Sequence, residues 1–469
     1  MDRRSFLSGL AFFSGGLALA STSLARRAVT FESTGDFESL RAYGYGELVP
    51  TASKNTGELI LALPKGFQYD VIGRVKGIMS DGRPTPPLHD GQWTFKVGSE
   101  LRIVRNHEVS NLSLPRENAG IGRRHHYDEM AGGGTTTLVI DKRSNQVIRD
   151  WISLSGTLIN CAGGPTPWGS WISCEETTLG KTVRTRADGR KTGGFPKPHG
   201  YCFEVPAAAN SEVIPVPLKA MGRFVHEAVA VDRKTSIVYL TEDFNPSGFY
   251  RFVPKRKGRL AEGGTLQMLT VEGRPSYDTR KGQKMRQPPL AAAWVTIDDP
   301  DPESADIDQS AVYKQGAARG GAVFSRLEGC EIDGKGNVYF TSTSGGDTRG
   351  GQVWIYSPDG ANKGFLKLAF ESPAPDILHM PDNIALMPRS GLLVICEDSD
   401  YGGQKAINHV RIMTADGKMA DFARNINKDF PRSEFAGSCF SPDGRTLFVN
   451  SQTAGMTLAI TGDWRDFKS

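Results

Sequence analysis

The amino-acid sequence predicts an all-β fold, a six-bladed β-propeller with inserted loops. Three observations support this prediction. Hairpin-like segments recur along the chain, helical periodicity is nearly absent, and successive copies lie about 40 to 55 residues apart. Each copy consists of a strand, a tight turn containing Asp, Pro or Gly, and a second strand, as in the inner hairpin of a propeller blade.

Four copies of this unit are clear and two are weaker. The clear copies begin at His226-Glu227, Leu327-Glu328, Asp382-Asn383 and Gly437-Ser438. The weaker copies cover residues 137–151 and 161–176, and six copies indicate six blades. We expect residues 31–60 to form a lead-in arm. We expect the polar segments 184–197, 255–287 and 298–321, rich in Gly, Pro and charged residues, to be loop insertions.

The first 30 residues differ from the rest of the chain. Arg3-Arg4 precedes an apolar stretch from Leu7 to Ala20, and small residues follow that could form a cleavage site. This layout is that of a twin-arginine export signal. The stretch is shorter than the roughly 20 residues that span a membrane, which favours a removable signal over an uncleaved anchor. We therefore expect residues 1–30 to be a signal peptide recognised by the twin-arginine export machinery. Residues 31–469 would form a single periplasmic or secreted domain with no membrane span.

Composition excludes one class of partner. The chain has 56 Lys and Arg residues against 52 Asp and Glu residues, a formal net charge of +4. We find no basic run with interleaved aromatic residues, so nucleic acid is not an expected partner. Six cysteines would allow three disulfides, but four of them lie in apolar strand-like runs where a free thiol packs as a small hydrophobic group. We expect no disulfide framework and a monomeric protein.

The segment from Asn160 to Glu176 combines a thiol, a glycine pair and two acids. Gly163 and Gly164 allow close approach of the backbone just after Cys161, and a short strand would carry Glu175 and Glu176 to its far end. These residue types indicate the rim of a metal site. The alternative is a buried cysteine followed by an ordinary turn and two solvated acids.

Other acids occupy matching places in the repeats. Counted back from the turn, Glu227, Glu328 and Asn383 align, and the second strands end in Glu175-Glu176, Glu242-Asp243 and Glu397-Asp398. Equivalent positions of a propeller are related by rotation, so these side chains should meet at one end of the axis. Clustered carboxylates repel one another unless cations neutralise them, and hard cations prefer oxygen ligands. The alternative for each acid pair is a solvated loop.

Two further segments complete the predicted site. The tetrapeptide from Arg105 to Glu108 follows a strand and offers both a histidine and an acid. Arg326 lies two residues before Glu328, so both side chains leave the strand on the same face. The arginine fork suits phosphate or carboxylate oxygens, although Arg326 could equally be a salt-bridge partner of Glu328.

Together these motifs resemble the PhoX-type alkaline phosphatases. The resemblance rests on the Asn160–Glu176 segment, the Arg105–Glu108 tetrad, His226-Glu227, Glu242-Asp243, Arg326 to Gly329, Cys396-Glu397-Asp398 and the segment 435–450, and it spans most of residues 40–465. It implies a six-bladed propeller exported by the twin-arginine route, with iron and calcium at its axis and a thiolate that bridges two irons.

Carried over residue by residue, the resemblance implies roles for the predicted site. Cys161 would be the bridging iron ligand, Glu227 and Glu328 would be iron carboxylates, and Arg326 would contact phosphate. Calcium-ligand roles would fall to some of Glu108, Glu175, Glu176, Asp382, Asn383, Glu397 and Asp398. Arg326, Cys161 and Glu328 would then be the catalytic residues.

The expected activity is metal-dependent hydrolysis of a small phosphate monoester, with diesters as an open extension. No Ser or Thr nucleophile beside a base stands out, so direct hydrolysis is the simplest proposal. Two other functions remain open: a calcium-dependent propeller lactonase or esterase, and a non-catalytic propeller held together by calcium. Both would use oxygen ligands alone, and neither requires Cys161.

Overall fold

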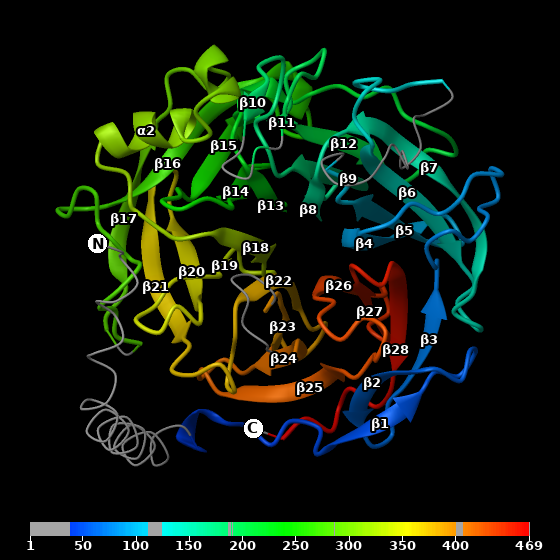
Figure 1. The fold of residues 1–469 in the computed structure, drawn as a ribbon. Helices are drawn as coiled ribbons and strands as arrows, with labels where there is room; N and C mark the ends of the chain where they lie inside the picture. The colour runs from blue at the N-terminus through cyan, green and yellow to red at the C-terminus, as the bar shows by residue number, and fades with distance from the viewer. Residues whose placement is uncertain are drawn as a thin grey trace, which may run out of the picture.

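The computed structural model describes residues 38–110, 124–185, 189, 191–285, 287–399 and 407–468. Residues 1–30, predicted to be the export signal, lie outside the described residues. Figure 1 shows sheets that follow one another around a common centre in chain order, as the progression of colour makes clear. No described helix is long and apolar enough to cross a membrane.

In the part of the chain that the structure describes, strands make up nearly all of the regular structure and form six sheets. One four-stranded sheet contains β4 (His89–Val97), β5 (Glu100–His107), β6 (Gly133–Ile140) and β7 (Val147–Thr157). A three-stranded sheet contains β8 (Asn160–Pro165), β9 (Ser170–Glu175) and β12 (Cys202–Pro206). A nine-stranded sheet contains β13 (His226–Val231), β14 (Val238–Glu242), β15 (Tyr250–Pro254), β16 (Gly264–Val271), β17 (Leu290–Thr296), β21 (Lys363–Glu371), β20 (Gln352–Asp359), β19 (Val338–Ser342) and β18 (Leu327–Ile332).

The remaining sheets complete the circle. A six-stranded sheet contains β22 (Pro381–Leu386), β23 (Leu393–Glu397), β24 (His409–Met413), β25 (Met419–Asn425), β2 (Leu59–Pro64) and β1 (Leu48–Ala52). A second four-stranded sheet contains β26 (Phe435–Phe440), β27 (Thr446–Ser451), β28 (Met456–Thr461) and β3 (Gln68–Ile72), and β10 (Arg184–Thr185) pairs with β11 (Lys191–Thr192). The helices among the described residues are α2 (Ala311–Ala318) and the short 3-10 turns η1 (Glu38–Leu40), η2 (Lys219–Met221), η3 (Leu260–Glu262) and η4 (Glu303–Asp306).

The arrangement is propeller-like, which confirms the all-β prediction. The inner strands β4, β8, β13, β18, β22 and β26 contact one another in that order, and β26 contacts β4 to close the circle. The sheets are less uniform than six separate four-stranded blades. Strand β17 pairs with both β16 and β21 and joins two groups of strands into the nine-stranded sheet. Strands β1 and β2 widen another sheet through β25.

The predicted hairpins are present, with one displacement. The four clear copies are β13–β14, β18–β19, β22–β23 and β26–β27, and the copy at 161–176 is β8–β9. The copy at 137–151 is instead the outer hairpin β6–β7. The inner hairpin of that sheet is β4–β5. The sequence analysis did not recognise it, because its strands are longer than those of the other copies and it has few of the turn residues used for the alignment.

All three segments predicted to be polar loops contain regular structure, which in residues 184–197 is the short β10–β11 pair. Residues 255–287 include β16, and residues 298–321 include α2. Strand β16 buries Leu266, Met268 and Val271, and α2 packs so closely on it that a Cβ at Gly316 would lie 2.2 Å from the sulfur of Met268. Tertiary packing on the outer part of the sheet therefore stabilises elements whose local composition favours loops.

Both ends of the described chain contribute to one sheet. Strand β3 pairs with β28, with Val71 opposite Leu458, and Figure 1 shows these two strands side by side. The same apolar core contains Tyr69 from β3 and Val449 from β27. The sheet that closes the circle is thus completed by a strand from the start of the domain.

Cys174 and Cys202 lie opposite each other on β9 and β12, with their sulfur atoms 3.6 Å apart. All six cysteines are free thiols in the structure. Five of the thiols are buried, and Cys161 is half-buried.

Candidate metal centre

A ring of polar side chains surrounds the axis at the second residue of each inner strand. Its members are Asp90, Cys161, Glu227, Glu328 and Asp382, with Ala436 at the sixth place. In five inner hairpins the register of the strand pairing shifts across this position, and in the sixth it shifts directly after Ala436. Such bulges re-aim side chains, and here they direct the second residues toward the axis. We call this set the inner ring.

A second ring lies closer to the solvent. It consists of the residue that follows each second strand: Glu108, Glu176, Asp243, Thr343, Asp398 and Gln452. Each backbone N–H of this set donates to the carbonyl of the residue just before the inner strand of its own hairpin, over 2.8 to 3.2 Å. We call this set the outer ring. The four inner-ring acids are buried and the four outer-ring acids are half-buried, so the centre opens on the outer-ring side.

The two rings bring ligand atoms within coordination range of one another. Three groups each offer atoms that all lie within 4.8 Å: Glu108 with Cys161 and Glu176, Asp90 with Glu108 and Glu434, and Glu227 with Glu328 and Asp382. The Cys161 thiol donates to Glu227 Oε1 at 3.3 Å and so links the groups. Gln452 Nε2 donates to Asp90 Oδ2 at 3.1 Å and to Glu108 Oε2 at 2.5 Å.

The electrostatics of the cluster favour cations. Burial, with a smaller contribution from the Asp398 carboxylate, raises the pKa of Asp90 to about 7 against the hydrogen bonds that it accepts. Burial also holds the pKa well above its usual range in Glu108, Glu176, Glu227, Glu328, Asp382 and Glu434. The pKa of the Cys161 thiol is raised by burial and by Asp90 and Glu227. Without cations these groups must hold protons, whereas bound cations would stabilise their ionised forms.

Arg326 contacts this cluster directly. Its Nε donates to Asp243 Oδ1 at 2.9 Å and its Nη2 to Asp243 Oδ2 at 3.2 Å, a bidentate contact. Nη2 also lies 2.7 Å from Glu328 Oε1. Burial alone would lower the pKa of Arg326, but Glu328 and Asp243 raise it above its ordinary value. The guanidinium is therefore held charged where the outer and inner rings meet.

Two predicted ligands, Glu175 and Glu397, lie outside the cluster. Each is the last residue of its strand, so its side chain leaves the strand opposite to the next residue. Glu175 accepts hydrogen bonds from the backbone of Leu158, Gly200 and Tyr201 and pairs with His199. Glu397 accepts from the backbone of His379 and His409 and pairs with Arg411. Both carboxylates are already satisfied, and each fixes the end of its strand rather than facing the axis.

Asn383 is also displaced from its predicted place. The turn that joins β22 to β23 has a hydrogen bond from Met387 N to Leu392 O, and the equivalent bond in the β13–β14 hairpin runs from Asp232 N to Ile237 O. Met387 therefore aligns with Asp232. Asp382, five residues before Met387, then takes the inner-ring position that Glu227 has in the earlier hairpin. The sequence alignment started this turn at Pro388, whereas the turn starts one residue earlier, at Met387. The aligned residues of this hairpin are therefore shifted by one position. Asn383 Nδ2 donates to Asp382 Oδ1 at 2.7 Å and its Oδ1 accepts from Gly437 N at 2.6 Å.

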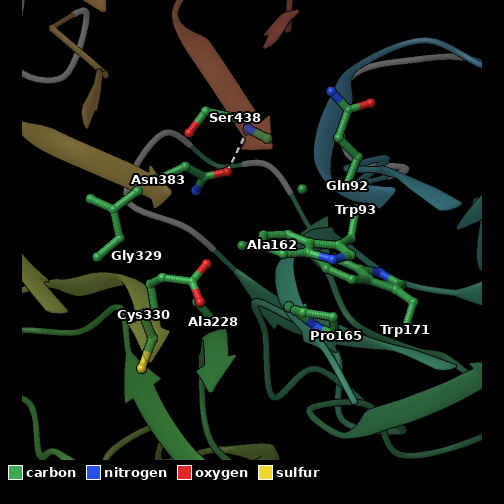
Figure 2. A pocket seen from close by; sticks show the side chains of 15 residues that line it. Gln92, Trp93, Ala162, Pro165, Trp171, Ala228, Gly329, Cys330, Asn383 and Ser438 are labelled. Carbon is green, nitrogen blue, oxygen red and sulfur yellow. Dashed lines mark hydrogen bonds between the residues drawn. The ribbon is translucent and has the colours of Figure 1, made fainter. Parts of the chain in front are cut away.

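The residues below the inner ring form a closed floor. The third residues of the inner strands are Gly91, Ala162, Ala228, Gly329, Asn383 and Gly437. The strands approach so closely that a Cβ at Gly329 would lie 2.5 Å from the Asp382 carbonyl oxygen. Figure 2 shows Asn383 reaching across this level to β26. A cavity of about 30 Å³ lies beneath it, beside the buried amide of Gln92.

The sequence prediction missed three residues of the centre and expected a fourth, Asp243, at the axis without giving it a role. Asp90 and Glu434 belong to the ligand groups, Asp243 holds Arg326, and Gln452 donates to two carboxylates. Asp243 was visible as the partner of Glu242, and Gln452 becomes recognisable once the outer ring is defined. Asp90 was hidden because its hairpin was not recognised. Glu434 precedes its strand and had no repeat signal.

Comparison with known proteins agrees with this geometry. A family model described as alkaline phosphatase PhoX matches residues 44–150 and 145–455, which is most of the chain. The chain belongs to the PhoX family. It is therefore a phosphatase, a member of the hydrolases. No curated protein matches the sequence.

Solved structures extend the comparison of the fold. PhoX from Pseudomonas fluorescens, in complex with vanadate, a transition state analogue, matches this PhoX-family chain with a TM-score of 0.66. The two sequences are 18% identical, and the match covers 90% of this chain and 98% of that one. The gluconolactonase XC5397 from Xanthomonas campestris matches with a TM-score of 0.39, 10% identity and coverage of 89% and 98%. A periplasmic gluconolactonase from Pseudomonas aeruginosa scores 0.38 with 14% identity and coverage of 86% and 94%. The first match supports the propeller fold, and the two gluconolactonase matches are too weak to support an argument.

Proposed function

We propose that this PhoX-family protein hydrolyses phosphate monoesters at an iron and calcium centre on the propeller axis. The observation that supports the proposal is the pair of rings, in which a thiol occupies one place in a ring of acids and Arg326 lies at their junction. A lactonase or a purely structural calcium site would need oxygen ligands alone and gives no reason for Cys161.

The donor set fits these metals. Glu227 Oε2 is buried and accepts no hydrogen bond from any described residue, which is costly for a carboxylate unless a cation binds there. Cys161 with Glu227 and Glu328 supplies the mixed sulfur and oxygen donors that suit iron. The carboxylates of Glu108, Glu176, Asp382, Asp398, Asp90, Glu434 and Asp243 supply the oxygen donors that calcium prefers. Bound iron and calcium would polarise the phosphoryl oxygens and offset the negative charge of the substrate.

The side chains of the protein would orient the substrate. Arg326 is held by Asp243 with its fork at the junction of the two rings, where a phosphate entering from the open side would meet it. Its N–H groups would donate to phosphoryl oxygens and stabilise the charge that develops on them. The closed floor of small residues would exclude solvent from the opposite side of the phosphate.

We further propose a six-bladed propeller for residues 31–469. The contacts of six inner strands support this count, with β13–β16 and β18–β21 as two blades bridged by β17. The extra strands β1 and β2 would then belong to the lead-in segment. Export by the twin-arginine route, a periplasmic or secreted location and a monomeric state complete the proposal. The export signal rests on Arg3-Arg4.

The experiment is metal analysis and kinetics on the protein purified from its native host. We expect iron and calcium, a visible thiolate-to-iron absorption band, and hydrolysis of p-nitrophenyl phosphate faster than that of bis-p-nitrophenyl phosphate. Cys161→Ser should lose iron, the band and activity while remaining folded. Cys330→Ala, at a buried cysteine below the floor, is the matched control and should keep all three. An active Cys161→Ser enzyme with its iron intact would contradict the proposed role of the thiol.

A further inference from the structure

A cleft of about 510 Å³ adjoins the metal centre on one side. It lies among three loops, and Asn245, Ser325 and Ser344 line it. Each of these residues is one or two positions from a residue of the centre, namely Asp243, Arg326 and Thr343. Two residues span at most about 7 Å of extended chain, so the cleft begins within a small molecule's length of Arg326.

Hydrogen bonds join these loops to one another. Arg326 N donates to Phe244 O at 2.9 Å, and Ser325 Oγ lies 2.8 Å from Ser344 Oγ. Gly346 N donates to Arg280 O at 3.0 Å, and Arg280 Nη1 donates to Asn245 Oδ1 at 3.1 Å. The position of the cleft relative to the centre is therefore fixed by the same loops that carry Arg326 and Asp243.

The charged lining of the cleft is mostly basic. Arg280, Lys281 and Arg349 line it together with one acid, Asp278. Arg280 is neutralised by a bidentate contact to Asp278, at 2.9 and 2.7 Å. Lys281 and Arg349 are exposed, and neither has an ion-pair partner among the described residues. Lys281 and Arg349 thus line a cleft that starts beside a strongly acidic centre, with Asp278 acting electrostatically on Lys281 and Asp347 accepting a hydrogen bond from Gly282 N next to it.

We infer that this cleft binds the leaving group of the substrate and selects phosphate monoesters whose leaving group carries a second anion, a carboxylate or a phosphate. The inference rests on the proposed function, because it requires that the scissile phosphate lies at Arg326. Lys281 and Arg349 then contact the second anion, and the hydroxyl and amide groups of Ser325, Ser344 and Asn245 face the intervening polar atoms. An exposed ion pair changes affinity by up to about fivefold, so two such contacts allow roughly a tenfold to twentyfold preference.

Matched substrate pairs test this selection on the metal-loaded enzyme. One pair is 3-phosphoglycerate and glycerol 3-phosphate, which differ by a carboxylate in place of a hydroxymethyl group. A second pair, fructose 1,6-bisphosphate and fructose 6-phosphate, tests a phosphate as the second anion. The expected result is a higher kcat/KM for the substrate with the second anion in at least one pair, mainly through KM. Added salt should reduce the preference.

Variants of the cleft distinguish binding of the second anion from differences in the reactivity of the leaving groups. The double variant Lys281→Gln with Arg349→Gln should reduce the preference about tenfold and leave p-nitrophenyl phosphate hydrolysis unchanged. Lys335→Gln is the matched control, since this exposed lysine lies in the turn at the opposite end of the β18–β19 hairpin. An unchanged preference in the double variant, or an equal loss with p-nitrophenyl phosphate, would overturn the inference while the proposed phosphatase stands. Failure of the loaded wild type to hydrolyse p-nitrophenyl phosphate would overturn both.

Discussion

Neighbouring residues at the ends of the second strands have opposite environments. Glu176, Asp243 and Asp398 belong to the outer ring, whereas Glu175, Glu242 and Glu397 point the other way and accept hydrogen bonds from the protein. The acid pairs in the sequence therefore combine one acid for the centre with one for the fold. The alternation of side chains along a strand explains this division. The acid pairs are visible in the sequence, but deciding which acid of a pair faces the axis requires knowing the residue at which each strand ends.

Arg326→Ala should separate turnover from folding. The arginine lies at the junction of the rings, and loss of such a donor to a developing charge typically slows turnover about 100-fold to 1,000-fold. We expect p-nitrophenyl phosphate hydrolysis to fall by this amount, and Arg326→Lys to recover only part of it because an ammonium lacks the bidentate geometry. The checks are kcat, metal content and melting temperature.

A structural role for Arg326 predicts another outcome. Since Arg326 also pairs with Asp243 and Glu328, its loss could instead release metals and lower the melting temperature. Normal turnover by the folded fraction of Arg326→Ala would then contradict a role in catalysis. Asp243→Asn is the companion variant. It keeps the arginine but weakens the contact that orients its fork, and it should lower kcat less than Arg326→Ala does.

At the scale of elements, buried ion pairs hold the ends of strands β9 and β23 in place. His199 is buried between two acids, with Nδ1 2.6 Å from Glu175 Oε1 and Nε2 3.6 Å from Asp128 Oδ2. The rings of Tyr127 and Phe195 pack against it, and Arg223 donates to its carbonyl. Burial opposes the charged form, but Glu175 and Asp128 raise the pKa of His199 from 6.5 to about 9.

This pKa predicts a loss of stability at high pH. A group whose pKa is higher in the folded state stabilises the fold fully below its unfolded value and loses that contribution as pH rises through about 9. Because the pKa of His199 rises from 6.5 to about 9 on folding, its contribution to the free energy of unfolding is on the order of 3 kcal/mol below pH 6.5. His199→Gln should thus lower the melting temperature by several degrees at pH 6 and by much less at pH 10. Equal losses at both values would show that the charge of His199 does not matter.

The glycine floor gives a prediction for the inner strands. A Cβ at Gly329 would lie 2.5 Å from the Asp382 carbonyl oxygen, so Gly329→Ala should force β18 and β22 apart. Overpacking of this kind costs about 1 to 3 kcal/mol, and the shift should also weaken metal retention because Glu328 and Asp382 flank the contact. Gly334→Ala, in the turn of the same hairpin, meets nothing within 4 Å and is the control. Similar melting temperatures and metal contents for the two variants would contradict this account.

At the scale of the whole molecule, the sequence predicted the propeller-like architecture better than the boundaries of its strands and hairpins. Four hairpins with clear turns gave the propeller, since each turn and strand pair is a local signal. The sixth hairpin was placed at β6–β7 instead of β4–β5, and with it Asp90 was missed. Strand β16 and helix α2 were read as loops because their stability comes from packing on distant strands. Both Asp382 and Asn383 were predicted as ligands, but the aligned position in the ring was given to Asn383, because the start of the turn cannot be located without the strand pairing.

Ring closure predicts that stability depends on the first strands of the domain. Strand β3 supplies the fourth strand of the last sheet, and Gln452 Nε2 reaches Asp90 across 362 residues of sequence. A chain that begins after β3, at residue 75, should fail to give a cooperative melting transition, whereas one that begins at residue 38 should melt like the full domain. A cooperative transition in the shorter chain would show that the other sheets are stable without closure.

The closing sheet also sets a time order for synthesis in the cell. Asp90 emerges from the ribosome early, but its hydrogen-bond partner Gln452 and the strand β28 emerge hundreds of residues later. The two rings therefore cannot be complete while the chain is still being translated through β27. If the proposed metals bind, they would enter the complete centre only after translation has passed β28, so loading of the complete centre would follow synthesis. For a chain that is exported already folded, both the ring and its metals would be completed before the chain leaves the compartment where it is made.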